Sequence, residues 1–397
     1  MLIPFSPPDI SEKEISAVTR VLSSGWITTG PVTKQFESQI CAYLKTSKTV
    51  CLNSATSCEE MILRFLGIGP GDEVIVPVYT YTATASPVCH VGAKLVFVDC
   101  GKDSFELDYD AVEEAITPHT KAIIPVDVGG IPCDYDRLMA IVERKKDLFS
   151  SVNPFLKKLG RIAVIADSAH AFGAEYHGKK CGAVADFTSF SFHAVKNLTT
   201  GEGGALTWRR IEGVSDDEIY NRLMLLSLHG QSKDAFSKME LGSWEYDIVS
   251  PDYKCNMTDI TAALGVAQLE RYPALSKRRE EIVLRYNEKL VPAGIWTAPH
   301  FQEGRVSSKH LYFTRVPGIS VNERNDIIVR MAEKGVAANV HYKPLAMMTA
   351  YKNLGFDIRN FPNAYAMYQN EITLPLHTRL SDEEVDYVAE TYLSCLK

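Results

Sequence analysis

The chain has 397 residues, of which 46% are hydrophobic and 23% are charged, a composition typical of a globular protein. At roughly 150 residues per domain, this length predicts two domains or three. The formal net charge of −7 argues against a general nucleic-acid binder, because such proteins present a basic face to phosphates.

Nine cysteines are scattered along the chain, and none forms a Cys-x-x-Cys pair. An odd number of isolated cysteines predicts reduced thiols and argues against a disulfide framework or a zinc knuckle, so we expect no metal. No apolar run approaches the ~18 residues of a membrane span, and residues 1–10 carry prolines in place of a signal sequence. We therefore expect a cytoplasmic protein that does not contact a membrane.

The N-terminal part of the chain predicts two helices. Residues 11–24 have the period of an amphipathic helix, with Ser11 as its N-cap and Glu14 three residues later. Residues 33–44 predict a second helix.

From residue 49 to about residue 206, short apolar runs alternate with helical periodicity. Strands of this length, flanked by Gly, Pro or Asp and separated by helices, indicate an α/β layer with a largely parallel sheet. Ligand sites in such sheets collect at the carboxyl ends of the strands. The expected strands are 50–52, 74–76, 95–98, 122–126, 163–166, 188–192 and 205–208.

Residues 144–160 interrupt this pattern with mixed charge and few strand formers, and we expect a solvated surface insertion there. A long helix is expected from residue 259 to about 290, followed by further short strands and helices. We expect a large domain at 1–269 and a smaller C-terminal α/β domain at 270–397, with this helix as the connector.

Small hydroxylated residues follow the first of these strands and open a helix that runs to about residue 66. Free backbone N–H groups and the helix dipole at such a start form a phosphate site. Ser and Thr also cap helices where no ligand binds, which is the simpler interpretation of this segment taken alone. The segment is Asn53, Ser54, Ala55, Thr56 and Ser57.

Two tyrosines, Tyr79 and Tyr81, follow the strand 74–76. Either ring could lie flat on a pyridine ring by offset stacking, or be a core tyrosine with a satisfied hydroxyl.

Asp167 follows directly after the strand 163–166, and His170 follows three residues later. Asp167 is either a helix N-cap or a functional acid, and a lone histidine such as His170 is usually structural.

Lys196 lies in a polar, glycine-bearing loop just after the strand 188–192. Most lysines are solvated, but this one is preceded by Ser191, which could donate to a phosphate, and by His193, which could cover a ligand. An amine and a carboxylate delivered by two strand ends are what pyridoxal phosphate (PLP) chemistry requires. The amine forms a Schiff base, and Asp167 keeps the ring nitrogen protonated so that the ring accepts electrons.

Further motifs extend over the chain in a fixed order, and their order and spacing are more specific than each motif alone. With the segments around Asp167 and Lys196, they make the chain resemble the DegT/DnrJ/EryC1/StrS family of nucleotide-sugar aminotransferases, which have the fold type I architecture of PLP enzymes. The chain is most similar to the branch that aminates C4 of a UDP-4-keto sugar. The motifs are 3–8 (IPFSPP), 24–31 (SGWITTGP), 69–77 (GPGDEVIVP), 253–257 (YKCNM) and 341–344 (HYKP).

The resemblance implies a role for each matching residue. Lys196 would bind PLP and act as general acid and base, Asp167 would pair with the ring nitrogen, and His170 would lie near the ring hydroxyl. Asn256 would reach the cofactor phosphate of the neighbouring subunit, so a homodimer would share its active sites. Tyr81 would stack on the ring, Ser54, Ala55, Thr56, Ser57 and Ser191 would bind the phosphate, and His193 would lie close by.

Substrate contacts are expected from the position of residues in these motifs, and the residues are Trp26, Thr28, Thr29, His229, His341 and Tyr342. Two departures concern the substrate and not the cofactor: Asp127 stands where the family often has His, and the segment 144–160 is unusual. Some relatives carry His in place of the lysine and are dehydratases, which Lys196 argues against.

The expected reaction transfers the amino group of L-glutamate to C4 of a UDP-linked 4-keto-6-deoxy hexose, with a 2-acetamido group, for a surface polysaccharide or glycan. Three alternatives stay open: a UDP-4-keto-pentose of the L-arabinose type, a dTDP-3- or dTDP-4-keto sugar, and a PLP-binding regulator without turnover.

Overall fold

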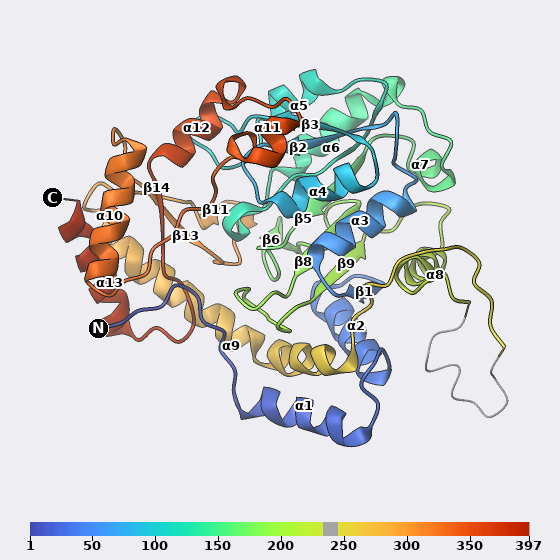
Figure 1. Ribbon diagram of the computed structural model, residues 1–397, viewed down its shortest axis with the longest axis horizontal. Helices are drawn as coiled ribbons and strands as arrows, with labels where there is room; N and C mark the ends of the chain where they lie inside the picture. The colour runs from blue at the N-terminus through green and yellow to red at the C-terminus, as the bar shows by residue number, and fades with distance from the viewer. Residues whose placement is uncertain (233–244, 397) are drawn as a thin grey trace.

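A seven-stranded sheet forms the centre of the computed structural model, which describes residues 1–232 and 245–396 (Figure 1). The strand order is β1-β9-β8-β5-β4-β2-β3. β9 is antiparallel to β1 and β8, and the other neighbouring pairs are parallel, which confirms the predicted mixed, mostly parallel sheet. The strands are β1 (Thr49–Leu52), β2 (Glu73–Pro77), β3 (Lys94–Val98), β4 (Thr120–Ile123), β5 (Ala163–Asp167), β8 (Phe187–Ser191) and β9 (Gly204–Trp208).

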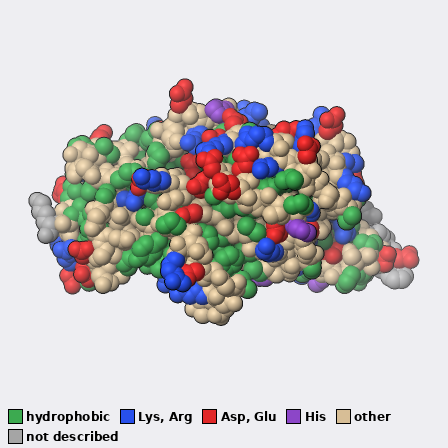
Figure 2. Space-filling view, turned by 90° about the horizontal axis from the view of Figure 1, so that it is seen from above, with side chains coloured by type: hydrophobic (Ala, Val, Ile, Leu, Met, Phe, Trp, Pro, Cys, Tyr) green, Lys and Arg blue, Asp and Glu red, His purple; other side chains and the backbone are tan. Residues whose placement is uncertain are grey.

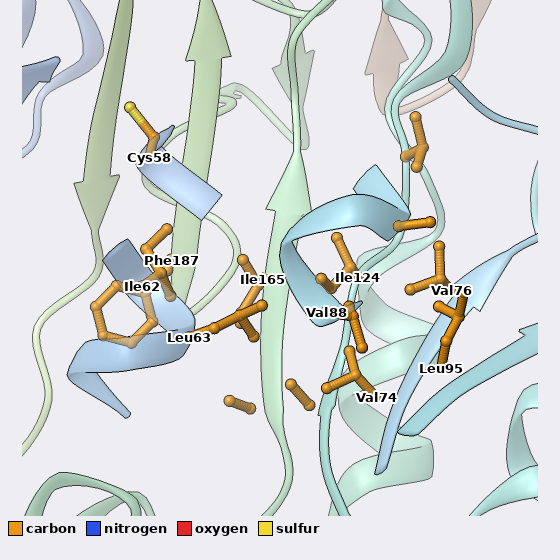
Figure 3. Close-up of a cluster of buried hydrophobic side chains, with 14 of the residues drawn as sticks. Cys58, Ile62, Leu63, Val74, Val76, Val88, Leu95, Ile124, Ile165 and Phe187 are labelled. Atoms are coloured by element: carbon orange, nitrogen blue, oxygen red, sulfur yellow. The ribbon is translucent and has the colours of Figure 1, made fainter. Parts of the chain in front are cut away.

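Helices cover both faces of this sheet because successive strand residues point to opposite sides. Val74, Val76 and Ile165 face α3 (Ala55–Phe65) and α4 (Thr82–His90) (Figure 3). Their neighbours in sequence, Ile75 and Val164, belong to a second cluster with α5 (Tyr109–Ala115) and α6 (Tyr135–Arg144). Near β1, the helix α2 (Pro31–Leu44) packs on that second face as well, and α8 (Asp216–Ser227) contacts α3.

The first helix, α1 (Glu12–Ser24), begins as predicted. The Ser11 hydroxyl accepts from the backbone of Lys13, and the Glu14 carboxylate accepts from the backbone N–H of Ser11 at 2.7 Å. The same carboxylate, fully buried, also accepts from Arg271 at 2.9 Å, which joins α1 to the long helix α9 (Asp259–Leu290).

The segment 144–160 is mostly exposed, as expected for a surface insertion, but it is also anchored to the core. It contains a 3₁₀ turn η2 (Lys146–Leu148) and the helix α7 (Pro154–Leu159), which packs on the end of α3. Leu156 is 1% exposed, and the Phe155 ring lies 4.2 Å from the Phe65 ring, centroid to centroid. The sequence did not reveal this attachment, because the apolar residues of the segment stand among charged ones and only Leu156 is fully buried.

The C-terminal part of the chain forms a three-stranded sheet with its own hydrophobic cluster, which lies to the left in Figure 1. This sheet has the order β10 (Trp296–Thr297), β13 (Tyr312–Arg315), β14 (Glu371–Leu374), and α10 (Val321–Glu333) and α13 (Asp382–Cys395) pack on it. The helix α9 extends from this part beneath the large sheet, as predicted for 259–290. The remaining elements are η1 (Val128–Gly130), η4 (Leu345–Met347), α11 (Thr349–Asn353), η5 (Ile358–Asn360) and α12 (Pro362–Gln369).

The division into 1–269 and 270–397 stays a prediction. Residue 270 lies inside α9, so a boundary there would cut a continuous helix. The hairpin of β11 (Phe301–Gln302) and β12 (Arg305–Val306) is joined to the hairpin of β6 (Glu175–Tyr176) and β7 (Lys179–Lys180) by the pairing of β12 with β6, which links the two parts by hydrogen bonds.

The surface carries charges of both signs in close mixture. On the face seen in Figure 2, acidic and basic side chains lie side by side. Two ion pairs join α5 and α6 in this way, Arg144 with Glu113 at 2.6 Å and Arg137 with Asp110.

In the described part of the chain, no helix is both long and apolar enough to cross a membrane.

Candidate active site

A cavity of about 330 Å³ lies at the carboxyl ends of β1, β2, β5 and β8, where the sheet pattern predicts a ligand site. Ten of the predicted site residues line it: Ser54, Ala55, Thr56, Tyr81, Asp167, His170, Ser191, His193, Lys196 and Tyr342. Seven lining residues were not predicted: Thr80, Ala83, Val126, Ala169, Val195, Glu202 and Gly203.

Asp167 is the last residue of β5. Its side chain points to the face that α3 and α4 cover, because it lies two residues after Ile165, which points to that face. Its carboxylate accepts from the Thr84 hydroxyl of α4 at 2.6 Å and from the backbone N–H of Ala169 at 3.1 Å. Burial raises the pKa of Asp167, and these two hydrogen bonds and the charge of Lys196 act in the opposite direction. Each carboxylate oxygen keeps a lone pair with which it can accept from a ligand.

Lys196 is held by a compact loop that follows β8. The backbone N–H of Lys196 donates to His193 O at 2.9 Å, and that of Thr200 returns to Phe192 O at 2.9 Å. Burial lowers the pKa of Lys196 to about 8, and the carboxylate of Asp167 opposes this shift. A substantial fraction of the amine is therefore neutral near pH 8, the form that reacts with a carbonyl group.

The start of α3 also lines the cavity, through Ser54, Ala55 and Thr56. The Ser54 hydroxyl accepts from the Ser57 N–H at 3.1 Å, so Ser54 is the N-cap, and Ser57 itself turns away to Asn53 at 2.7 Å. The first N–H groups of a helix have no intrahelical acceptor, and the dipole favours an anion there. β9 approaches so closely that a Cβ at Gly204 would lie 2.4 Å from the backbone carbon of Ser54.

The hydrogen bonds of His170 determine which of its ring nitrogens carries the proton. The backbone N–H of Gly129 donates to Nδ1 at 3.1 Å, so Nδ1 must be unprotonated and Nε2 carries the hydrogen. Nε2 then donates to the Tyr342 hydroxyl oxygen at 3.0 Å. Burial and the charge of Lys196 lower the pKa of His170 well below its usual value, which keeps the ring neutral. The Tyr342 hydroxyl is left with its own hydrogen to donate.

The structure distinguishes the roles of Tyr79 and Tyr81, which the sequence left open. Tyr79 is 0% exposed and donates to the backbone carbonyl of His341 at 2.8 Å, so it is a core residue. Tyr81 lines the cavity and is 61% exposed, with its ring centroid 6.0 Å from that of Tyr342. Tyr81 is therefore placed to cover a ligand from the solvent side.

A second group of predicted residues lies around the start of α2, outside the cavity lining of this chain. Asn256 donates to the Thr29 hydroxyl at 2.5 Å, and Thr29 donates to the backbone of Met257. The Trp26 indole N–H donates to Thr29 O at 3.2 Å, and Thr28 O accepts from the backbone of Asp259 at 3.1 Å.

Two further predicted residues also lie away from the cavity lining. His229 is exposed, with a left-handed backbone φ of 58°. His341 stacks on Phe5, and its Nδ1 bonds to Thr373 at 2.9 Å. The substrate roles of these residues stay predictions.

Asp127 does not line the cavity, although we expected it to alter substrate contacts. It is 0% exposed and accepts from the Tyr135 hydroxyl at 2.8 Å and the Ser168 hydroxyl at 2.5 Å. Burial raises the pKa of Asp127 to about 6. Its place next to Ser168 makes it a support for the loop that carries His170.

The cavity fits PLP by its donor set. Its lining includes an amine with a lowered pKa, a carboxylate that can accept from a ring nitrogen, and a helix N-terminus that can bind a phosphate. Its volume lies in the range of small-molecule sites, about 300–1,000 Å³. Among the described residues, no group of three or more His, Cys, Asp or Glu side chains is arranged to hold a metal ion.

The chain is similar to proteins of a known family over nearly its whole length. The DegT/DnrJ/EryC1/StrS aminotransferase family matches residues 8–392. The spore coat polysaccharide biosynthesis protein SpsC of Bacillus subtilis is 37% identical over 399 residues, which cover 100% of this chain and 97% of SpsC.

Solved structures show the same fold. The putative sugar aminotransferase Spr1654 from Streptococcus pneumoniae, in its PMP form, is 58% identical, with a TM-score of 0.97 over 99% of this chain and 98% of that one. Its PLP form is 57% identical, with a TM-score of 0.96 over 100% and 98% of the chains. PseC from Helicobacter pylori, an aminotransferase involved in the biosynthesis of pseudoaminic acid, is 29% identical, with a TM-score of 0.86 over 100% and 99%.

These relatives confirm the predicted fold type and cofactor. The large mixed sheet is that of PLP-dependent aminotransferases of fold type I, and pyridoxal phosphate is the cofactor of this enzyme. The family match extends over nearly the whole chain. The chain belongs to the DegT/DnrJ/EryC1/StrS aminotransferase family.

Proposed function

We propose that this enzyme transfers the amino group of L-glutamate to C4 of a UDP-linked 4-keto-6-deoxy hexose, with a 2-acetamido group, for a surface polysaccharide or glycan. The observation that carries the proposal is the shared cavity of Lys196 and Asp167 next to the start of α3. The names of the relatives support a sugar as acceptor: Spr1654 is described as a sugar aminotransferase, and SpsC as a polysaccharide biosynthesis protein.

Bound PLP supplies an electron sink and carries the amino group between the two substrates. Lys196 lines the cavity, and its amine, with a pKa of about 8, can both accept and return a proton near neutral pH. Neither half of a transamination needs another base if this amine moves the proton in both directions.

Other residues would bind and orient the cofactor. Asp167 would accept from the ring nitrogen, and the backbone N–H groups of Ala55 and Thr56 would hold the phosphate. His170 fixes the Tyr342 hydroxyl so that the tyrosine can donate to an oxygen of the ligand.

A long substrate can enter from the side that Tyr81 lines, because this ring is 61% exposed. A nucleotide sugar is such a substrate, since only its keto sugar has to reach Lys196. The nucleotide would extend over the protein surface, where the predicted substrate contacts would be made.

To test the substrate, PLP-loaded protein is incubated with L-glutamate and with UDP- or dTDP-linked keto sugars, and the product is identified by NMR. The proposal expects an amino group at C4 of the UDP-4-keto-6-deoxy hexose. Amination of a UDP-4-keto-pentose or at C3 of a dTDP sugar would assign the substrate to an alternative. A protein that binds PLP but consumes no amino donor would favour a regulator.

We also propose a homodimer with shared active sites, acting in the cytoplasm. The position of Asn256 supports sharing, since it bonds to Thr29 outside the cavity of its own chain. The nine free thiols support a reducing compartment.

The sharing can be tested by mixing two inactive variants, Lys196→Ala and Asn256→Ala. If sites are shared, a mixed dimer has one intact site. Random reassortment would then restore about one quarter of the wild-type turnover per chain, because half of the dimers are mixed. No recovery after confirmed subunit exchange would contradict the sharing.

A further inference from the structure

A second buried carboxyl group, that of Glu59, lies behind Asp167. Asp167 of β5 pairs with Ser189 of the neighbouring parallel strand β8, so both side chains point to the face beneath α3. The Ser189 hydroxyl donates to Glu59 Oε1 at 2.9 Å. Glu59 is 0% exposed, and its Oε2 is buried and accepts no hydrogen bond from the described residues.

Glu59 is not placed there by an ion pair. On α3 it shares the apolar face of Ile62 and Leu63, which pack in the core. Among the ion pairs of the described residues, none includes Glu59, whereas its neighbour Glu60 pairs with Arg64 at 2.7 Å. A buried carboxylate without a cation is costly, so Glu59 is stable there as the neutral acid.

The surroundings of the two carboxyl groups decide which of them holds the proton. Asp167 accepts from the Thr84 hydroxyl and the Ala169 N–H and faces Lys196, all of which favour its charged form. Glu59 accepts from one hydroxyl only, that of Ser189. Burial and the charge of Asp167 raise the pKa of Glu59 well above its usual value, whereas the interaction with Glu59 acts against the rise that burial causes in the pKa of Asp167.

We propose that Glu59 is a positioning residue for the cofactor: as a neutral acid it directs its Oε2–H to Asp167 and holds that side chain as a carboxylate facing the PLP ring nitrogen. This inference rests on the proposed role of Asp167 and does not depend on the sugar substrate. The hydrogen-bond donor of Glu59, and not its volume, is the property that matters.

Three variants separate this role from simple packing. Glu59→Gln keeps the length of the side chain and a donor, Glu59→Met keeps the volume without a donor, and Glu60→Gln changes the neighbouring acid on the outer side of the same helix. Each apoprotein is titrated with PLP, and its dissociation constant is measured by absorption. Infrared difference spectra of wild type against Glu59→Gln, both as apoprotein at neutral pH, then report the protonation state of Glu59 directly.

We expect Glu59→Met to weaken PLP binding about tenfold or more, since a hydrogen bond to a charged group is lost. Glu59→Gln and Glu60→Gln should stay within about threefold of wild type, and the difference spectrum should contain the carbonyl band of a protonated carboxylic acid. The proposal is overturned if that spectrum contains carboxylate bands alone, if Glu59→Met binds PLP as wild type does, or if Glu59→Gln is weakened equally.

The infrared experiment needs no cofactor and stays decisive if Glu59→Met does not fold. An Asp167→Asn variant measured in parallel shows whether Asp167 contributes to PLP binding at all. If it does while Glu59 fails these tests, only the role of Glu59 is refuted, and the proposed role of Asp167 stands.

Discussion

The substitution Asp167→Asn isolates the charge of the carboxylate that we place at the ring nitrogen. The side chain keeps its shape, and the amide oxygen can still accept from the Ala169 N–H, which donates to Asp167 at 3.1 Å. The amide nitrogen can take the position that faces the Thr84 hydroxyl, which is able to act as donor or acceptor. Folding should therefore change little, since the carboxylate that is removed is buried and has a raised pKa.

The expected loss falls on the cofactor. A hydrogen bond to a charged group contributes about 1.5–3 kcal/mol, so PLP should bind roughly 10- to 150-fold more weakly. Turnover with PLP at saturation should fall by a further factor of about 100 or more, because an unprotonated ring nitrogen accepts electrons poorly and each 1.4 kcal/mol is tenfold in rate.

Three measurements on the same preparations distinguish charge from folding. PLP titration of the apoprotein gives the dissociation constant, rapid mixing with glutamate gives the rate of the first half-reaction, and thermal unfolding gives the stability. Wild-type affinity together with a wild-type half-reaction would refute the role of Asp167. A large fall in the unfolding temperature would instead assign a structural role to the carboxylate.

Three further predictions test the lysine and the fold. Lys196→Ala should abolish turnover and still bind pyridoxamine phosphate, and normal transamination by this variant, measured by release of 2-oxoglutarate, would contradict the assignment. The rate at which PLP reacts with the apoprotein should rise with pH and level off above about pH 8, because the pKa of Lys196 is lowered to about 8 and the neutral amine reacts. A profile identical to that of PLP with butylamine would show an unshifted lysine. Leu156→Ala should lower the free energy of unfolding by about 2–5 kcal/mol in urea, whereas the exposed Lys157→Ala should change it by less than about 0.5 kcal/mol, and equal effects would mean that α7 does not pack on the core.

The sequence predicted the large sheet well because its strands are short apolar runs that end at polar residues. Asp167 and Lys196 were recognisable for the same reason, since each follows a strand whose carboxyl end faces the site. Strand ends were less accurate: 122–126 became β4 (Thr120–Ile123), because Pro125 has no N–H to donate and the chain turns toward Asp127.

The features that the sequence missed depend on contacts between distant elements. Glu59 lies on the apolar face of α3, three residues before Ile62 and four before Leu63. An acidic residue on such a face is visible in the sequence, but only the structure explains it. Nothing in the sequence marks Thr84, because its hydroxyl reaches the Asp167 carboxylate only when α4 and β5 come together in the fold. The segment 144–160 is mostly exposed, and its attachment through Phe149, Phe155, Leu156 and Leu159 depends on distant core residues that its own sequence does not reveal.

The most direct test of the account is to identify the lysine that binds PLP. The PLP-loaded protein is reduced with borohydride, which fixes the cofactor to its lysine, and the protein is digested and analysed by mass spectrometry. We predict a single modified peptide, with the pyridoxyl phosphate mass on Lys196. A modification on another lysine, or none in a protein that has bound PLP, would contradict the proposed active site.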